Sequence, residues 1–326
     1  MSSQIYLFED EQLTALDVAA GRPLRWAAWH PDGSWCLLVG NGGTALRYEP
    51  GESKLRPIDT GTKRNLRGAA FSPDGNRALL VGNRGAVLLY DGRVVEPLPS
   101  PSNENLRRVA WHPDGEFALI VGNGGTALRY QAPSTLRLRS GQASLRAGDA
   151  LAPLPGDRAH TLRAIAWRPD GAYALIGAYA TRFAGYPRPH PLYKCDGRYV
   201  QALLATDDDD DFVAIDWHPD GRQALIAGYA YDERTDTASS KLLTYDGAGF
   251  GSQAVETTGA LLGAAWHPSG EYALLCGEGG ALLRYTSDGI EQLASGTRDN
   301  LVGPFWQPDG SSALLLRGPG ERMYTV

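Results

Sequence analysis

Short apolar runs alternate with turn residues along the whole chain. In one stretch the runs Leu106–His112, Phe117–Val121 and Thr126–Tyr130 are separated by Pro113-Asp114-Gly115 and by a Gly-Asn-Gly-Gly segment. Proline presets φ for a type I turn, and glycine supplies the left-handed residue that completes a tight hairpin. The pattern therefore predicts three short strands and a poorer fourth. Because the runs are continuously apolar rather than alternating, we expect sheets that are covered on both faces.

This unit recurs seven times, and each copy carries an aromatic residue two positions before a turn proline. The prolines are Pro31, Pro73, Pro113, Pro169, Pro219, Pro268 and Pro308, with separations of 42, 40, 56, 50, 49 and 40 residues. The 18 residues after Pro308 and the 31 residues up to Pro31 together make 49, which is one more period. Such periods are typical of propellers and solenoids, and only a closed ring has a reason to complete the period across the ends. The sequence predicts an all-β, seven-bladed β-propeller of four-stranded antiparallel blades, as a single domain over residues 1–326.

The two ends of the chain are expected to share the last blade. Residues 4–18 are predicted to supply the outermost strand of the blade that carries Trp306. Two segments, Gln4–Phe8 and Glu321–Val326, fit the third strand of that blade equally well. Pairing the ends would remove exposed sheet edges and hold the ring closed.

The aromatic-x-Pro-Asp-Gly element followed by a short apolar strand resembles the bacterial WD-repeat-like and TolB-like propellers. The resemblance covers nearly the whole chain. It implies a scaffold with variable binding surfaces and transfers no catalytic residue. The WD dipeptide and the Gly-His signature of eukaryotic WD repeats are missing from this sequence.

Two units depart from the repeat in the connection between their second and third strands. This connection is longer by 10 residues in unit 4 and by 9 in unit 5. Both insertions fall on the end of the ring that we call the top, opposite the Pro-Asp-Gly turns. Long loops in compact domains are often functional, and aromatic and arginine side chains are enriched at binding surfaces. The candidate binding residues in the insertions are Tyr179, Phe183, Tyr186, His190, Tyr229 and Tyr231. The alternative is that the two hairpins pack on each other and bind nothing.

Arginine occupies the second position of the inner strand in four consecutive units. These residues are Arg25, Arg67, Arg107 and Arg163, whereas units 5 to 7 carry Val213, Leu262 and Val302. They predict an electropositive half-ring at the top of the channel, suited to an anionic side chain, a phosphate or a charged peptide. The acidic run 207–211, with Asp209 as a candidate contact, and Asp299 are expected at the same end. The alternative is that the arginines pair with neighbouring Asp or Glu and only stabilise the blades.

Other chemistry-bearing residues are interpreted as structural. Four histidines precede turn prolines, and since separate blades hold them apart we expect local hydrogen bonds rather than a metal site. The acidic run lacks the spacing of a calcium loop and is expected to be solvated. Cys36 and Cys276 are expected as core thiols. A basic insertion at 132–149 is expected on the bottom or outer rim.

The net charge of −6 argues against nucleic acid and anionic membranes as partners. No apolar run is long enough to span a membrane, and the first ten residues do not resemble a signal peptide. We expect a cytoplasmic, monomeric binding module without cofactor or metal, which recognises a protein or peptide through its top face. One alternative is an enzyme with a channel site, which would need His160, His190 or the acidic run to converge. Another is a lectin, although the insertions are confined to units 4 and 5.

Overall fold

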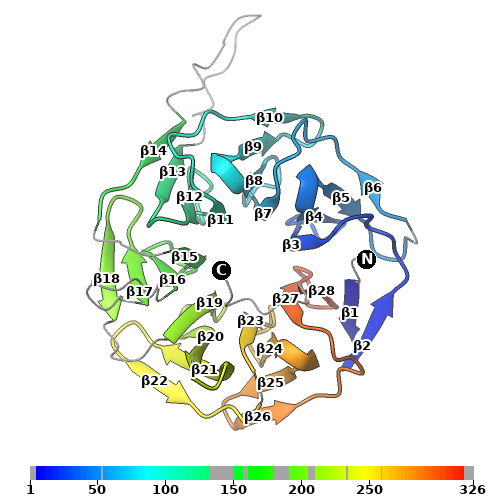
Figure 1. The fold of residues 1–326 in the computed structure, drawn as a ribbon, viewed down its shortest axis with the longest axis vertical. Helices are drawn as coiled ribbons and strands as arrows, with labels where there is room; N and C mark the ends of the chain where they lie inside the picture. The colour runs from blue at the N-terminus through cyan, green and yellow to red at the C-terminus, as the bar shows by residue number, and fades with distance from the viewer. Residues whose placement is uncertain are drawn as a thin grey trace, which may run out of the picture.

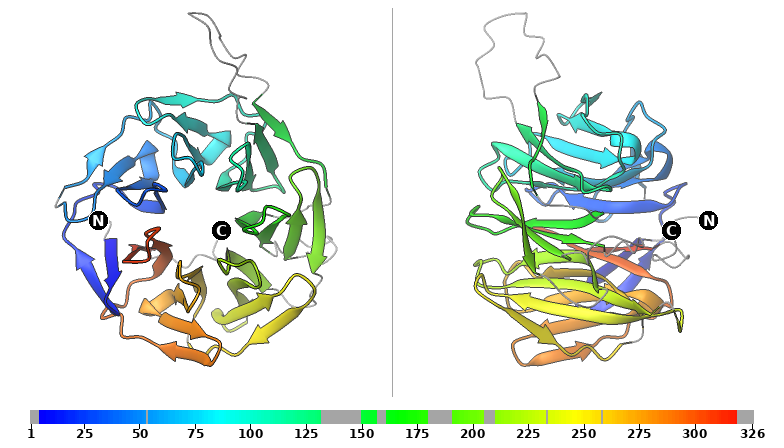
Figure 2. Two further views of the ribbon diagram at one scale, coloured as in Figure 1. Left: turned by 180° about the vertical axis from the view of Figure 1, so that it is seen from behind. Right: turned by 60° about the vertical axis from the view of Figure 1, so that its left-hand side comes forward.

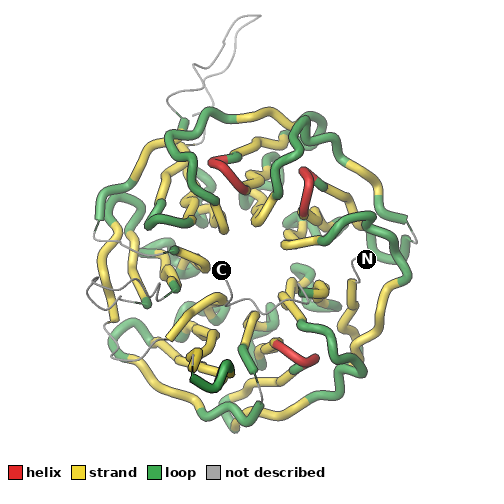
Figure 3. The backbone as a smooth tube through the Cα atoms, viewed as in Figure 1, coloured by secondary structure: helices red, strands yellow, loops and turns green. Residues whose placement is uncertain are grey.

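The computed structural model describes residues 5–52, 54–131, 150–156, 161–179, 191–204, 210–232, 234–257 and 259–318. Seven four-stranded antiparallel sheets surround a central channel, so the prediction of a seven-bladed β-propeller is confirmed (Figure 1). Within the described residues the only helical segments are three 3-10 turns at the connections between second and third strands (Figure 3): η1 (Asn41–Gly43), η2 (Asn83–Gly85) and η4 (Glu278–Gly280).

The strands share their order from the channel outward in every blade. The inner strands are β3 (Leu24–Trp29), β7 (Leu66–Phe71), β11 (Leu106–Trp111), β15 (Leu162–Trp167), β19 (Asp210–Trp217), β23 (Leu261–Trp266) and β27 (Leu301–Trp306). The second strands are β4 (Cys36–Gly40), β8 (Ala78–Gly82), β12 (Phe117–Gly122), β16 (Ala174–Ala178), β20 (Ala224–Asp232), β24 (Ala273–Gly277) and β28 (Ala313–Arg317). The third strands are β5 (Ala45–Tyr48), β9 (Val87–Tyr90), β13 (Ala127–Gln131), β17 (Leu192–Cys195), β21 (Thr237–Tyr245), β25 (Leu282–Thr286) and, in the last blade, β1 (Ile5–Glu9). The outer strands are β6 (Arg56–Pro57), β10 (Val95–Pro97), β14 (Leu151–Pro153), β18 (Val200–Leu204), β22 (Phe250–Gln253), β26 (Gly289–Gln292) and β2 (Gln12–Leu16).

The last blade is shared by the two ends of the chain, as predicted, in the order β2-β1-β28-β27. The N-terminal segment supplies more than the outermost strand expected of it. It forms a hairpin through Asp10 and Glu11, both at positive φ, and this hairpin fills the third and the outer place. Ile5 pairs with Leu316, and Phe8 with Ala313. The competing segment 321–326 lies outside the described residues.

The core lies between neighbouring blades. The second strands are buried along most of their length, which explains their continuously apolar sequences. The recurring aromatic residue connects the blades: the Trp111 indole is 7% exposed, and its Nε1 donates to the carbonyl of Ala70 in the preceding blade at 3.1 Å. Trp29, Trp167 and Trp306 make the equivalent bond to Phe305, Ala110 and Ala265.

The four turn histidines join blades as well as turns. In each turn Nδ1 bonds within the turn, as expected, at 2.7 Å from Asp32 for His30. The other ring nitrogen reaches further than predicted: His30 Nε2 lies 3.1 Å from the carbonyl of Gly75 in the next turn. The equivalent partners are Gly171, Gly270 and Gly310 for His112, His218 and His267. The bottom of the ring is therefore held by hydrogen bonds from turn to turn.

Several expectations fall on or beside the gaps in the description. Phe183, Tyr186, His190, Asp209, His160 and the insertion at 132–149 lie outside the described residues.

Cys36, Cys195 and Cys276 are buried and free of disulfides. In the described parts of the chain, no helix has the length and apolar character needed to cross a bilayer.

Candidate functional site

The four predicted arginines are held at the channel mouth by a β-bulge in each inner strand. The register of β3, β7, β11 and β15 against the second strand skips one residue, and in every case the skipped residue is the arginine. A bulge leaves its extra residue outside the ladder and redirects its side chain. The same irregularity in four consecutive blades turns the arginines toward the mouth. These four arginines line one cavity of about 60 Å³ together with Arg108 and Arg317, and the six are called the arginine cluster below.

Three of these guanidinium groups are oriented by asparagines of the neighbouring turn. Nε of Arg25 donates to Asn41 Oδ1 at 2.9 Å. Arg67 makes the same bond to Asn83 at 2.8 Å, and Arg107 to Asn123 at 2.7 Å. Each bond uses the Nε–H of the arginine, so the asparagine does not occupy the two terminal amino groups. These amino groups can bind a carboxylate or phosphate bidentately.

Blade 4 orients its arginine differently. Tyr179 replaces the turn asparagine there, and the Arg163 guanidinium lies over its ring at 4.2 Å from the centroid. Behind it, Tyr229 is fully buried and packs with Tyr179, Val213 and Leu262. Its side chain is therefore not available to a partner, contrary to its selection as a contact residue. The inserted segment of blade 5 continues β20 and β21 as a longer hairpin, and Tyr229 lies at the buried base of this extension.

The charge of the four bulged arginines of the cluster is not neutralised within the described residues. No described carboxylate forms an ion pair with Arg25, Arg67, Arg107 or Arg163; only Arg317 has one, to Asp299 at 3.1 Å. Burial and then the neighbouring guanidinium groups lower the pKa of Arg67 to about 10 and that of Arg107 to about 9. The described structure thus lends no support to the alternative of internal pairing with Asp or Glu for these four.

The acidic run 207–211 was expected to be a solvated loop, and Asp210 departs from this expectation. Asp210 belongs to β19, is 5% exposed and pairs with Lys241 at 3.2 Å, so it is not part of a solvated loop. Asp299, expected near the mouth, lies there: it pairs with Arg317 and accepts a hydrogen bond from the Tyr6 hydroxyl at 2.6 Å. The tyrosine belongs to β1, and hence the N-terminal strand is tied to the rim of the site.

Tyr231 is placed at the end of the blade 5 hairpin. Its hydroxyl donates to Asp236 at 2.6 Å within that hairpin. β20 and β21 have nine residues each, compared with five in β4 and four in β5. The extra length is at the top end, so this hairpin stands beside the mouth (Figure 2).

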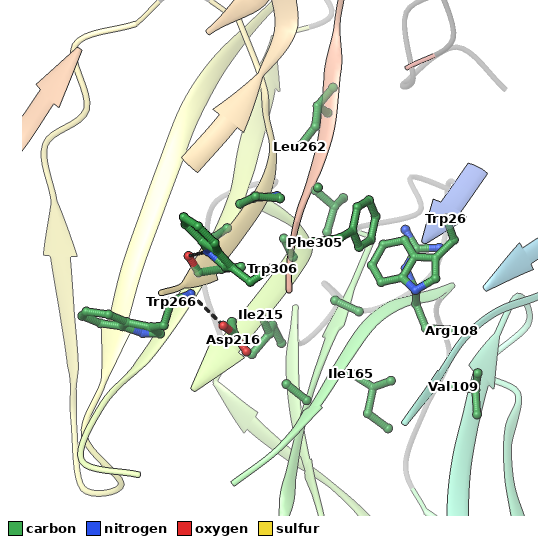
Figure 4. A pocket seen from close by; sticks show the side chains of 18 residues that line it. Trp26, Arg108, Val109, Ile165, Ile215, Asp216, Leu262, Trp266, Phe305 and Trp306 are labelled. Atoms are coloured by element: carbon green, nitrogen blue, oxygen red, sulfur yellow. Dashed lines mark hydrogen bonds between the residues drawn. The ribbon is translucent and has the colours of Figure 1, made fainter. Parts of the chain in front are cut away.

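A second cavity, of about 320 Å³, occupies the channel beneath the cluster. Counting the first apolar residue of the inner strand, such as Leu24, as position 1, positions 3 and 5 are Gly or Ala in ten of fourteen cases. The four exceptions are Trp26, Arg108, Asp216 and Phe305, and all four line this cavity (Figure 4). The sequence analysis did not select these four residues. An alignment of the seven inner strands shows them as the large or charged exceptions at positions 3 and 5.

The four exceptions divide between two sides of the cavity. The Arg108 guanidinium stacks on Trp26 at 3.8 Å from the ring centroid, and Trp26 meets Phe305 edge to face at 4.7 Å. Arg108 Nη1 donates to the carbonyls of Arg67 and Arg107 at 2.9 Å, and its buried Nε has no hydrogen-bond partner among the described residues. Desolvation lowers the pKa of Arg108 to about 9.

Asp216 lies on the other side, where Figure 4 shows its bond to the backbone of Trp266. The Trp266 N–H donates to Asp216 Oδ2 at 2.7 Å. Burial raises the pKa of this carboxyl to about 7, although the backbone N–H groups of Trp266 and Trp217 act in the opposite direction. Among the described residues that line the cavity, Asp216 is the single acid. In the described part of the chain no group of three His, Cys, Asp or Glu side chains is arranged to hold a metal ion.

The geometry defines the chain as a seven-bladed β-propeller with a basic mouth above an apolar channel. Comparison with models of known protein families and with curated proteins gave no match.

Proposed function

We propose that the protein is a non-catalytic binding module that recognises an anionic group of a protein or peptide at the channel mouth of its top face. The observation that carries this proposal is the arginine cluster. Four bulged arginines converge on one cavity, and no described carboxylate pairs with them. Partly buried guanidinium groups that repel one another are costly unless a ligand neutralises them.

The proposed partner is a protein or peptide because the long hairpin of blade 5 adds surface beside the mouth, and a single small ion would not need it. The resemblance to bacterial WD-repeat-like and TolB-like propellers supports the same role, since it implies a scaffold with variable binding surfaces. A cytoplasmic location fits the free, buried cysteines.

Selection from a random-peptide library tests the proposal. Peptides retained by the wild-type protein should be rich in acidic groups and should bind the double variant Arg67→Gln/Arg107→Gln at least about tenfold more weakly. The matched control is Arg93→Gln/Arg198→Gln, which removes two exposed arginines at the opposite end of the ring. Peptides that bind both double variants as tightly as the wild type would contradict the proposal.

Asp216 favours a second candidate, an enzyme with a channel site. A carboxyl with a raised pKa in a cavity is a feature of many active sites. Against this, the described lining of the cavity offers no second acid with which Asp216 could divide acid and base roles.

A further inference from the structure

The arginine cluster and the channel cavity adjoin each other at Arg108. Arg108 lines both the mouth cavity of about 60 Å³ and the deeper cavity of about 320 Å³. A ligand whose anionic group sits at the mouth therefore has space directly beneath it.

Apart from Arg108 and Asp216, the side chains that line the space beneath the mouth are mostly apolar. Its walls include Ile165, Ile215 and Phe305, and alanines fill much of the remaining surface. Water gains few hydrogen bonds against such walls, so an apolar group that replaces it is favoured roughly in proportion to the area buried. The small residues at positions 3 and 5 keep this room open. At position 5, blade 7 carries the ring of Phe305, whereas blades 4 and 6 carry alanine. The alanines leave that part of the channel unfilled.

The order of the two cavities restricts the ligand. An internal aspartate or glutamate side chain ends at its carboxylate, so nothing of that side chain would remain to fill the channel. The last residue of a peptide carries its carboxylate and its side chain on the same carbon. One group can then occupy the mouth while the other enters the channel, and the preceding residues leave across the top face beside the blade 5 hairpin.

We infer that the arginine cluster and the channel together bind the C-terminal residue of a peptide, with its carboxylate among the guanidinium groups and an apolar side chain in the channel. This inference rests on the proposed function and specifies its ligand. Charge-assisted hydrogen bonds at the mouth recognise the free carboxylate, and the channel selects the side chain on the same carbon.

Calorimetric titration with three small peptides tests the inference on the wild-type protein. The peptides are N-acetylglycylphenylalanine, its C-terminal amide and N-acetylglycylglycine. The free phenylalanine acid should bind at least about tenfold more tightly than the amide, which lacks the charge, and than the glycine acid, which lacks the side chain. No variant is needed for this comparison.

Two variants then locate the subsites. Ala166→Phe places in blade 4 the ring that Phe305 places in blade 7, and should abolish the preference for phenylalanine over glycine while leaving the weaker binding of the glycine acid. Arg107→Gln should weaken both acids, and Arg93→Gln should change neither. A cooperative melting transition and an unchanged circular dichroism spectrum identify variants that fold.

Each other result overturns the inference in a recognisable way. Equal affinity for the phenylalanine and glycine acids would show that the channel reads no side chain, and the proposed anion site would stand. Binding of phenylacetate as tight as that of the peptide would assign the site to small organic acids. Binding of pyrophosphate without any peptide binding would rule out a chain terminus. Failure of every anion to bind would refute the proposed function itself.

Discussion

Replacing Arg107 by glutamine should stabilise the unliganded protein. The side chain lies among like charges, and burial together with these charges lowers its pKa from 12.5 to about 9. At about 1.4 kcal/mol for each pKa unit, holding the charged form there costs at most about 5 kcal/mol. The variant loses the bond to Asn123, which contributes about 1 kcal/mol net. Solvent and counter-ions at the open mouth recover part of the cost, so we expect a net gain of about 1–3 kcal/mol.

Urea unfolding at low and high salt measures this effect. The gain of Arg107→Gln should be largest at low salt and should shrink as salt screens the repulsion in the wild type. The control Arg93→Gln, at an exposed position, should change the free energy of unfolding by less than about 0.5 kcal/mol. If Arg107→Gln instead destabilises the protein by about 1 kcal/mol or more, equally at both salt concentrations, the arginine is a structural hydrogen-bond donor and the reasoning is refuted.

Three further changes test other parts of the account. Asp216→Asn should remove a pH dependence of stability, because a carboxyl whose folded pKa is raised from 3.8 to about 7 makes the wild type lose at most about 4 kcal/mol as pH rises through that interval. Urea unfolding from pH 4 to 8 measures the slope, and equal slopes for the two proteins would contradict a raised pKa at Asp216. Trp111→Ala should cost roughly 3–5 kcal/mol, since the indole is buried and bonded to Ala70; a loss below about 1 kcal/mol in the same measurement would mean that the blade contact is dispensable. Deleting residues 1–18 removes β1 and β2 and exposes the edge of β28, so the melting temperature should fall sharply or folding should fail; an unchanged melting temperature would count against the closure of the ring.

The repeat made most of the fold predictable from sequence. Apolar runs and Pro-Asp-Gly turns are local signals, and they recur in each unit at the period of a blade. Closure was predictable in outline because residues 4–18 continue the same spacing. The number of strands that this segment contributes was not, because Asp10 and Glu11 form a two-residue turn without the glycine that usually marks one.

The candidate site was predictable only in part. The arginines stand out because they share one position in four units, but their lack of carboxylate partners depends on where distant acids lie in space. Asp210 illustrates this: the sequence places it in an acidic run, and the structure pairs it with Lys241 of β21, on the far side of β20 in the same blade. The channel cavity was missed because the described residues that line it come from six separate blades, each of which contributes one to four of them, so no single segment of the sequence marks it. Tyr229 was misjudged since length alone does not tell a loop from an extended hairpin.

Anion binding at the channel mouth is the central claim, and a crystal soaked in selenate tests it most directly. Selenate is a divalent anion whose selenium can be located by anomalous scattering. The account predicts a selenium peak at the mouth, with selenate oxygens within hydrogen-bond distance of the guanidinium groups of Arg67 and Arg107. Selenium peaks elsewhere on the surface, with none in the arginine cluster, would contradict it.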